Sequence, residues 1–429
     1  MTTKYCPALL ISAPASGQGK TTITSALARF YTERGKKVRI FKTGPDFLDP
    51  MILEQASGLP VYQLDLWMGG EEHCRQLLYQ AAGEADLILI EGVMGLFDGT
   101  TSSADLAALF GIPVVVIIDA TAMAQTFGAI AYGLANYREN LRFAGVIANR
   151  VASPGHGDML AESLNGIPYI AALPRDPDCE LPSRHLGLVQ AEEIKDLNHR
   201  IDVAKQHFID ANFDYQAAAV AFKQAEEFAV PSLLKGQRIA VARDSAFAFV
   251  YKANLELLKD MGAEIFNFSP LHDNGLPEVD SIYLPGGYPE LHLEALAKNT
   301  TMHEAIKKHQ QQGKPIVAEC GGMLYLLESL TDKDGYSQNM LGLLKGHAKM
   351  QQRLANLGMH SIELDEAEIR GHTFHHSTLE TNLTPVAVSK SSRKRGKGEA
   401  VYRQGNLHAS YLHLYFPSNP EASAALFMV

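Results

Sequence analysis

Short runs of consecutive apolar residues alternate with longer, mixed apolar and polar segments along most of the chain. In the first half, such runs end near Ser12, Lys42, Glu91, Asp119, Val151 and Pro174. Runs of this length predict strands that are buried on both faces, and the segments between them, such as residues 23–31, predict helices. This alternation predicts a parallel sheet with right-handed crossovers, and therefore an α/β fold. The Ala-rich, charged stretch from residue 192 to about residue 228 predicts mostly helix.

The apolar pattern is interrupted over residues 229–237, which read Ala-Val-Pro-Ser-Leu-Leu-Lys-Gly-Gln. Proline and glycine without periodicity indicate a linker. A new series of predicted strands and helices begins at residue 238. Because 429 residues are too many for one ordinary core, we predict a first domain over 1–228, a linker over 229–237 and a second domain over 238–429.

Composition and charge narrow the classes of partner. The net charge of −10 disfavours nucleic-acid binding. The four cysteines lie far apart, and the histidines at 372, 375 and 376 alternate as in a strand, so neither set suggests a metal site. We find no signal peptide and no apolar run long enough to span a bilayer. We therefore expect a cytoplasmic protein with neither a nucleic-acid nor a membrane partner.

The loop after the first apolar run reads Ala-Pro-Ala-Ser-Gly-Gln-Gly-Lys-Thr-Thr and precedes a predicted helix, as in a P-loop. Gly17 and Gly19 let backbone N–H groups face phosphate oxygens. Lys20 can reach the outer phosphates, and the Thr21 hydroxyl can bind Mg²⁺. Pro14 departs from the usual first glycine. A simple glycine-rich turn is the alternative, but the order strand, loop, helix favours nucleotide binding.

Carboxylates follow two of the predicted strands. Asp46 and Asp49 lie on the loop Gly-Pro-Asp-Phe-Leu-Asp-Pro. Glu91 ends a later strand, and Asp98 lies on the glycine-rich loop after it. Ligands of open α/β sheets bind at the carboxyl ends of strands, where an acid can hold Mg²⁺ on a nucleotide. The alternative for Asp46 and Asp49 is an Asx turn before a helix, and the alternative for the acids of the later loop is that they are solvated.

Three polar residues further along are additional candidates. Asn149, near the end of the apolar run 141–151, can contact a nucleotide base. Arg184 and His185 share the loop Leu-Pro-Ser-Arg-His-Leu-Gly-Leu and can bind substrate carboxylates in this acidic chain. A plain surface pair explains Arg184 and His185 equally well.

Cys320 lies in Pro-Ile-Val-Ala-Glu-Cys-Gly-Gly-Met-Leu-Tyr-Leu, which predicts a strand, an abrupt turn and the start of a helix. Small neighbours permit the strained backbone of a nucleophile turn. We expect the helix N-terminus to lower the pKa of the thiol and the turn to hold it toward solvent. A buried structural cysteine is the alternative. Two glycines directly after Cys320 disfavour it, since a core strand gains nothing from them.

Two other stretches can complete a site around Cys320. Gly286 and Gly287 follow a predicted strand, and their N–H groups can form an oxyanion site. A simple tight turn is the alternative. A thiol nucleophile also needs a base. His413, which follows the strand-like Ala-Ser-Tyr-Leu, is our candidate and is expected at the end of that strand.

The two halves together pair a Cys–His acyl-transfer site with an ATP site. Acyl transfer from the amide of L-glutamine releases ammonia, and ATP can activate a carboxylate to receive it. This pairing indicates a glutamine-dependent amide ligase.

These stretches together resemble the cobyrinate a,c-diamide synthase family, a branch of the cobyrinate/cobyric-acid-type glutamine amidotransferases. The likeness covers nearly the whole chain. Its motifs occur in the family's order and comprise residues 16–22, 44–50, 91–99, 183–188, 285–290, 318–322 and 409–414. The resemblance implies an N-terminal P-loop domain similar to dethiobiotin synthetase and a C-terminal, flavodoxin-like class I glutamine amidotransferase domain.

The resemblance also implies residue roles. Cys320 would be the nucleophile and His413 its base. Many related domains carry a glutamate two residues after the base, where this chain has Tyr415, so the group that orients His413 stays open. The implied ATP-binding residues are Ser16, Gly17, Gly19, Lys20, Thr21, Thr22 and Asn149. The implied Mg²⁺ ligands are Thr21, Asp46 and Glu91. The implied substrate-binding residues are Asp46, Phe47, Leu48, Asp49, Asp98, Arg184 and His185.

The implied reaction is ATP-dependent phosphorylation of the a and c side-chain carboxylates of cobyrinate, a corrinoid, followed by amidation with ammonia in cobalamin biosynthesis. The same chemistry on hydrogenobyrinate or nickel-sirohydrochlorin is an alternative. Cytidine triphosphate synthase has the same architecture, but the stretches 44–50 and 183–188 disfavour it. A P-loop switch ATPase with an inactive glutaminase-like domain is an alternative from another class. The oligomeric state is left open, with a homodimer among the options.

Overall fold

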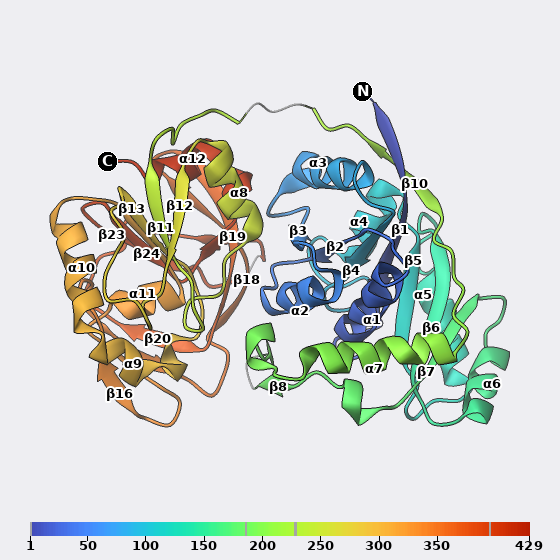
Figure 1. The fold of residues 1–429 in the computed structure, drawn as a ribbon. Helices are drawn as coiled ribbons and strands as arrows, with labels where there is room; N and C mark the ends of the chain where they lie inside the picture. Colours follow the sequence, from blue (N-terminus) through green and yellow to red (C-terminus); the bar gives the residue numbers. More distant parts are fainter. Residues whose placement is uncertain (1, 185–186, 227–229, 394–395) are drawn as a thin grey trace. The chain divides into compact units, whose positions relative to one another are not determined.

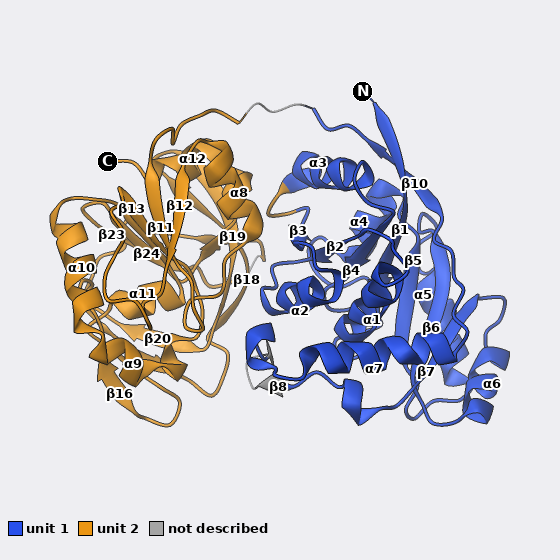
Figure 2. Cartoon of the chain, in the orientation of Figure 1, with its two compact units in different colours: residues 1–66, 70–227 blue, residues 67–69, 228–429 orange. Residues whose placement is uncertain are grey.

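The computed structural model describes residues 2–184, 187–226, 230–393 and 396–429 (Figure 1). Internal contacts divide the chain into two compact units (Figure 2). Unit 1 comprises residues 1–66 and 70–227, and unit 2 comprises residues 67–69 and 228–429. The linker at 229–237 stays a prediction. Each unit has its own sheet and core.

Unit 1 is built on an eight-stranded sheet in the order β3-β2-β4-β1-β5-β6-β7, with β10 paired to β1 outside this path. All pairs along the path are parallel. The strands are β1 (Thr3–Ser12), β2 (Val38–Thr43), β3 (Tyr62–Leu64), β4 (Leu87–Glu91), β5 (Val114–Asp119), β6 (Phe143–Val151), β7 (Tyr169–Pro174) and β10 (Ala219–Lys223). Every residue of β4 is buried, as its continuous apolar run predicts.

Helices cover both faces of this sheet (Figure 1). α1, α2 and α7 pack against one another, while α3, α4 and α5 contact strands separately from them. Because crossovers are right-handed, a helix that leads to a strand nearer the β3 edge covers one face of the sheet, and a helix that leads to a strand nearer the β7 edge covers the opposite face. The helices are α1 (Lys20–Thr32), α2 (Leu48–Ser57), α3 (Gly70–Ala82), α4 (Ser103–Phe110), α5 (Thr126–Asn136), α6 (Pro154–Glu162) and α7 (Leu197–Asp210). β8 (Ser183–Arg184) and β9 (Gly187–Leu188) form a two-stranded ribbon.

The prediction of mostly helix up to residue 228 is wrong at its C-terminal end. α7 accounts for part of the stretch, but β10 then pairs antiparallel with the first half of β1. Val220 and Phe222 are buried, and their neighbours in the strand are exposed. This period of two is the signature of a strand with one covered face. It was hidden because alanine, which dominates the stretch, suits either structure.

Unit 2 contains a seven-stranded sheet in the order β12-β11-β13-β14-β24-β23-β21. It is parallel from β12 to β24 and antiparallel beyond. Its strands are β11 (Arg238–Ala242), β12 (Glu264–Phe268), β13 (Ser281–Leu284), β14 (Ile316–Glu319), β21 (Ala387–Val388), β23 (Ala400–Gln404) and β24 (Leu407–Ser410). The helices are α8 (Lys252–Asp260), α9 (Leu293–Lys298), α10 (Thr300–Gln311), α11 (Gly321–Leu326) and α12 (Pro420–Ala425), with η3 (Pro289–Leu291) before α9.

Two four-stranded sheets complete unit 2. One has the order β16-β15-β17-β20, and the other, antiparallel throughout, has the order β22-β18-β19-β25. Their strands are β15 (Ser329–Thr331), β16 (Ser337–Asn339), β17 (His347–Met350), β18 (Asn356–Leu364), β19 (Ala367–His375), β20 (Ser377–Glu380), β22 (Lys390–Ser391) and β25 (His413–Leu414). In the described parts of both units, no helix combines the length and the apolar character needed to cross a membrane.

Candidate active sites

The loop before α1 has the backbone geometry of an anion cradle. Gly17 and Gly19 have φ angles of 80° and 91°, a region that favours glycine. A Cβ on Gly19 would lie 2.4 Å from Nδ2 of Asn149, so no larger residue fits. Gly19 is also the N-cap of α1 and offers no capping side chain. The first N–H groups of the helix and its dipole are therefore directed at this loop, as anion binding requires.

Lys20, the first residue of α1, is buried with its ammonium held at the same loop. Nζ donates hydrogen bonds to the carbonyls of Ala15 at 3.2 Å and Met94 at 2.7 Å. Burial and the positive charge of Lys42 lower the pKa of Lys20. Met94 lies on the loop after β4, so Lys20 bridges two loops at the carboxyl edge of the sheet.

A second lysine, Lys42 at the end of β2, lies at the centre of an ion-pair cluster that the sequence analysis did not identify. Nζ of Lys42 is 2.7 Å from Glu91, 2.6 Å from Asp49 and 3.6 Å from Asp46. Its side chain is only 2% exposed. Burial lowers the pKa of Lys42, but the carboxylates more than offset this and hold it above its usual range. A lysine inside a buried strand was the available signal, because such a lysine needs partners.

Thr21 and Glu91 fit a hard cation. The Thr21 hydroxyl donates to Oε1 of Glu91 at 3.0 Å. Oε2 of Glu91 is buried and has no hydrogen-bond partner among the described residues. Burial raises the pKa of Glu91, although Lys42 opposes this. A buried carboxylate oxygen beside a hydroxyl suits Mg²⁺, which prefers oxygen ligands and usually shares them with phosphates and water. The described ranges contain no cluster of three or more His, Cys, Asp or Glu residues that could hold a metal by itself.

Asn149 and Asp98 support the loops of this edge. Nδ2 of Asn149 donates to the carbonyl of Gln18 at 2.9 Å. Oδ2 of Asp98 accepts a hydrogen bond from the N–H of Gly95 at 3.0 Å. Both side chains thus stabilise the loops that would surround a nucleotide.

The other predicted residues of unit 1 belong to the same loops and helix starts. Phe47 is the N-cap of α2 and Leu48 its first residue. Ser16 is exposed in the loop before α1, and Thr22 lies in the first turn of that helix. His185 and the side chain of Arg184 lie outside the described residues, so the predicted carboxylate-binding pair is not placed.

In unit 2, Cys320 forms a sharp turn between β14 and α11. Its φ and ψ angles are 42° and −107°, and a positive φ is uncommon for cysteine. The turn packs closely against its surroundings. A Cβ on Gly321 would lie 2.9 Å from the backbone nitrogen of Gly287, and one on Gly322 would lie 2.1 Å from the carbonyl oxygen of Leu284. These contacts explain the two glycines, and the strained nucleophile turn is the geometry that the sequence predicts.

The predicted lowering of the thiol pKa is wrong. Cys320 is 7% exposed rather than held toward solvent. Burial raises the pKa of the thiol, and the negative charge of Glu290 raises it further. The backbone N–H of Gly321, at the start of α11, lowers the pKa of the thiol, but burial outweighs this effect. A base must therefore take the proton of the thiol when it reacts.

His413 packs against the Pro-Gly-Gly turn after β13. A Cβ on Gly286 would lie 2.2 Å from Cε1 and 2.9 Å from Nδ1 of the His413 ring. The Gly286–Gly287 turn therefore borders both the cysteine turn and the histidine. Burial and the neighbouring His375 lower the pKa of His413 to about 3. The imidazole is thus neutral, and burial makes it a weaker base than an exposed histidine.

The position of His413 in the fold differs from the sequence prediction. β24 ends at Ser410, and His413 lies after a turn in β25, which belongs to a different sheet. A strand-like sequence therefore continues through a change of sheet, which local periodicity does not reveal.

Glu319 links the strand of the cysteine to the segment of the histidine. Its Oε1 accepts the backbone N–H of Leu414 at 3.0 Å, and its Oε2 accepts the hydroxyl of Tyr283 at 2.8 Å. Glu319 directly precedes Cys320, and Leu414 directly follows His413. One buried carboxyl group thus constrains the spacing of the two segments. Burial raises the pKa of Glu319 to about 8. The sequence analysis missed it, although an acid in an otherwise apolar strand was a signal.

His372 is the cross-strand partner of His413 in the β19–β25 pair. The two rings are stacked, with centroids 4.9 Å apart and planes 19° apart. The Tyr251 hydroxyl forms a 2.8 Å hydrogen bond with Nδ1 of His372. Tyr415, two residues after His413, packs its ring edge-on against Tyr251 with centroids 5.3 Å apart. His413 thus stacks on a histidine that is itself held by a tyrosine.

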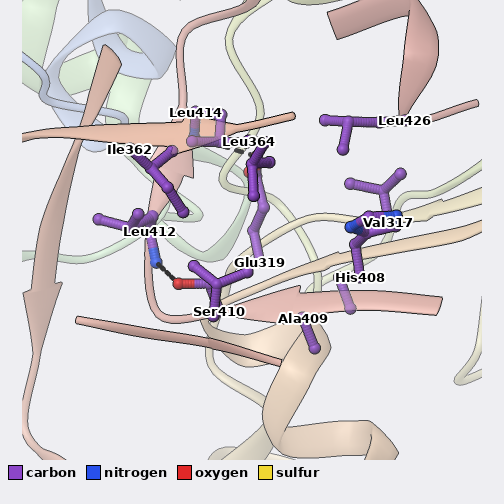
Figure 3. Close-up of a pocket in the computed structure, with 12 residues that line it drawn as sticks. Val317, Glu319, Ile362, Leu364, His408, Ala409, Ser410, Leu412, Leu414 and Leu426 are labelled. Carbon is purple, nitrogen blue, oxygen red and sulfur yellow. Dashed lines mark hydrogen bonds between the residues drawn. The ribbon is translucent and has the colours of Figure 1, made fainter. Parts of the chain in front are cut away.

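A small apolar pocket of about 20 Å³ lies beside Glu319 (Figure 3). Its walls include Val317, Leu412 and Leu414, and the N–H of Leu412 donates to Oγ of Ser410 at 3.1 Å. This volume accommodates about one water molecule. The pocket is therefore too small to be the binding site of an amino-acid substrate.

Comparisons with known proteins place a different family model on each half of the chain. The CobQ/CobB/MinD/ParA nucleotide binding domain matches residues 9–189, and the CobB/CobQ-like glutamine amidotransferase domain matches residues 238–421. These matches confirm the predicted α/β class, with a nucleotide-binding part followed by a glutamine amidotransferase part.

Relatives align over nearly the full length. The chain is 60% identical to the hydrogenobyrinate a,c-diamide synthase of Stutzerimonas stutzeri, over 99% of both chains. It is 57% identical to the protein of the same name from Pseudomonas aeruginosa, over 99% of this chain and 98% of that one. It is 50% identical to the cobyrinate a,c-diamide synthase of Herminiimonas arsenicoxydans, over 98% and 96% of the two chains. The predicted family is confirmed, and the chain belongs to the a,c-diamide synthase family of glutamine amidotransferases.

Proposed function

We propose that this chain is an ATP- and glutamine-dependent ligase that amidates the a and c side-chain carboxylates of a cobyrinate-type macrocycle. One observation carries the proposal. One chain carries a P-loop bordered by Lys20 and Glu91, and also a strained cysteine turn and His413 that both pack against the Gly286–Gly287 turn. Its full-length relatives are named a,c-diamide synthases.

Unit 2 is the proposed glutaminase half. In it, the Cys320 thiol gives its proton to the neutral His413 imidazole and attacks the side-chain amide of glutamine. The N–H groups of Gly286 and Gly287 stabilise the oxyanion. His413 returns the proton to the departing nitrogen as the C–N bond breaks, which releases ammonia and leaves a thioester. Water, activated by the same imidazole, then frees glutamate and the thiol.

Unit 1 is the proposed synthetase half. In it, the glycine loop and Lys20 hold the phosphates of ATP. Thr21 and Glu91 would hold Mg²⁺, with Asp46 as a further candidate ligand. When bound, Mg²⁺ neutralises charge on the transferred phosphoryl group. Asp49, Asp98, Phe47, Leu48, Arg184 and His185 are proposed to position the macrocycle and its reacting carboxylate. The carboxylate takes the γ-phosphoryl group of ATP to give an acyl phosphate and ADP, and ammonia then displaces phosphate to form the amide.

The metal state of the macrocycle is the finer question. We infer a corrinoid of the cobyrinate type, and the relatives at 60% and 57% identity favour its cobalt-free form, hydrogenobyrinate. The relative at 50% identity is named for cobyrinate. Incubation with each macrocycle, ATP and glutamine, followed by mass spectrometry, distinguishes them. A gain of two amide groups on one macrocycle identifies the substrate, and no gain on either contradicts the assignment.

The decisive test is replacement of Cys320 by Ala. Glutamine-driven amidation is expected to vanish, while amidation driven by added ammonium persists, because the synthetase half needs only ammonia. Loss of both activities in a folded variant would contradict the two-site scheme. If the Cys320→Ala variant still hydrolysed glutamine, Cys320 would not be the nucleophile. We further propose a cytoplasmic location, and a homodimer stays a prediction that light scattering can test.

A further inference from the structure

Glu290 is a buried acid beside the cysteine turn that the proposed chemistry leaves unused. It lies in η3, three residues after Gly287, and is 8% exposed. η3 packs against α11, the helix that begins directly after Cys320. Cδ of Pro289, the preceding residue, lies 2.9 Å from where a Cβ on Gly321 would be. η3, which carries Glu290, therefore borders the cysteine turn.

The charge of Glu290 is not balanced by a cation of the chain. Within the described ranges, no Lys, Arg or His forms an ion pair with it; its own backbone N–H stabilises its charge, and Asp332 repels it. Burial and this repulsion raise the pKa of Glu290 to about 7. Among charged groups, Glu290 also has the largest effect on the Cys320 thiol. A carboxyl group that acts electrostatically on the nucleophile thus lacks a compensating cation among the described residues.

A buried carboxylate without a cationic partner is costly, and structures retain one mainly where a partner or ligand compensates it. Glutamine brings such a group. Only three bonds separate its amide carbon from its α-carbon, so its α-ammonium has to lie near any nucleophile that attacks the amide. A carboxylate on η3, which borders the turn, is within reach of that ammonium.

We propose that Glu290 binds the α-ammonium group of glutamine and makes the glutaminase half specific for α-amino acid amides. This inference rests on the proposed role of Cys320 in glutamine hydrolysis. The carboxylate and the ammonium form a charge-assisted hydrogen bond that is shielded from water. A substrate amide without the ammonium would leave the buried carboxylate uncompensated.

The test compares glutamine with glutaramate, which is glutamine without its α-amino group. Ammonia release from each amide is measured with the full-length chain, in the presence of ATP and macrocycle. The parent enzyme is expected to prefer glutamine by about 100-fold or more in kcat/KM, as for a site whose buried polar group is left unpaired. In Glu290→Gln, kcat/KM for glutamine should fall by a similar factor, while that for glutaramate should stay within about threefold.

Two controls separate the explanations. Glu294→Gln removes the same charge from a side chain that is 64% exposed and should leave the preference for glutamine unchanged. Ammonium-driven amidation should be equal in all variants and reports that the chain is folded. If Glu290→Gln lowers hydrolysis of both amides equally, the residue is structural and the proposal is wrong.

The parent enzyme alone can also overturn the proposal, even if the variant does not fold. Equal use of glutamine and glutaramate by the parent would mean that no group recognises the ammonium. Cys320→Ala in the same assay keeps the two hypotheses apart. If it still hydrolyses glutamine, the proposed function fails. If it does not, and Glu290→Gln leaves the preference intact, only the role of Glu290 fails.

Discussion

The imidazole rings of His372 and His413 are stacked because antiparallel register places the two residues opposite each other on neighbouring strands. Side chains at such paired positions project from the same face and lie in contact. Tyr251 holds the far side of the pair through its hydrogen bond to Nδ1 of His372. A tyrosine–histidine pair thus lies against the proposed base.

Removing the Tyr251 hydroxyl should loosen this arrangement without altering the reacting groups. In Tyr251→Phe we expect kcat for glutamine hydrolysis to fall about tenfold, the loss of roughly one hydrogen bond, about 1.4 kcal/mol. KM for glutamine and ammonium-driven amidation should not change. Steady-state kinetics with each nitrogen source measure this. Tyr336→Phe, at a half-exposed tyrosine, is the control. A parallel fall in both activities would mean that Tyr251 merely supports the fold.

The buried carboxyl of Glu319 predicts a pH-dependent stability. Its pKa of about 8 in the folded chain is above the ordinary glutamate value of about 4.3 in an unfolded chain. The folded state therefore keeps a proton that the unfolded state loses, and stability falls as pH rises from about 4 to 8. The free energy of unfolding falls by up to about 1.4 kcal/mol for each pH unit between the two pKa values.

Glu319→Gln lacks this titration and should lose less stability than the parent between pH 5 and pH 8.5. Urea unfolding at both pH values measures the difference. Glu363→Gln, at a glutamate whose side chain is 59% exposed, should behave like the parent. A variant with the parent's full pH dependence would show that Glu319 is not the responsible group.

Close packing between Gly286 and the His413 ring predicts a selective loss of activity. In Gly286→Ala the new methyl group would lie 2.2 Å from Cε1 of the ring, so the imidazole has to move. A displacement near 1 Å costs about 100-fold in rate when groups must be aligned. We expect that loss in glutamine-driven amidation and none in ammonium-driven amidation. Gly275→Ala, where no atom lies within 4 Å of the new methyl group, is the matched control. Full glutamine-driven activity in Gly286→Ala would contradict this geometry.

The ion cluster around Lys42 predicts a stability effect in unit 1. Lys42→Met removes the cation that compensates Glu91 and Asp49, and breaking such a buried cluster costs about 3 kcal/mol or more. The loss of unfolding free energy in Lys42→Met should be smaller at pH 5, because protonated carboxyl groups no longer repel one another. Thermal unfolding at pH 5 and pH 7.5 tests this. Lys37→Met is the control, since Lys37 is 47% exposed and pairs at 3.8 Å. Equal losses in the two variants would contradict the role of the cluster.

Much of the architecture could be predicted from local sequence. The continuous apolar runs correspond to β1, β2, β4, β5, β6 and β7, and the glycine loop before α1 lies where strand, loop and helix require it. The turn at Cys320 could be predicted because the glycines after it permit a strained, closely packed backbone that larger residues would exclude. β10 could not, since alanine fits both structures and only the edge of β1 determines the pairing.

By itself, the sequence determined the α/β class, the P-loop, the cysteine turn and the family, because each depends on residues that are adjacent in the chain. Only the tertiary structure decided which distant groups meet: Lys42 with Glu91, Glu319 with Leu414, and His372 with His413. Strand order and register determine these pairs, and both depend on the packing of the whole unit. Burial also decided the direction of the shift in the Cys320 pKa, since the local helix N-terminus predicted a lower thiol pKa and the surrounding core raises it.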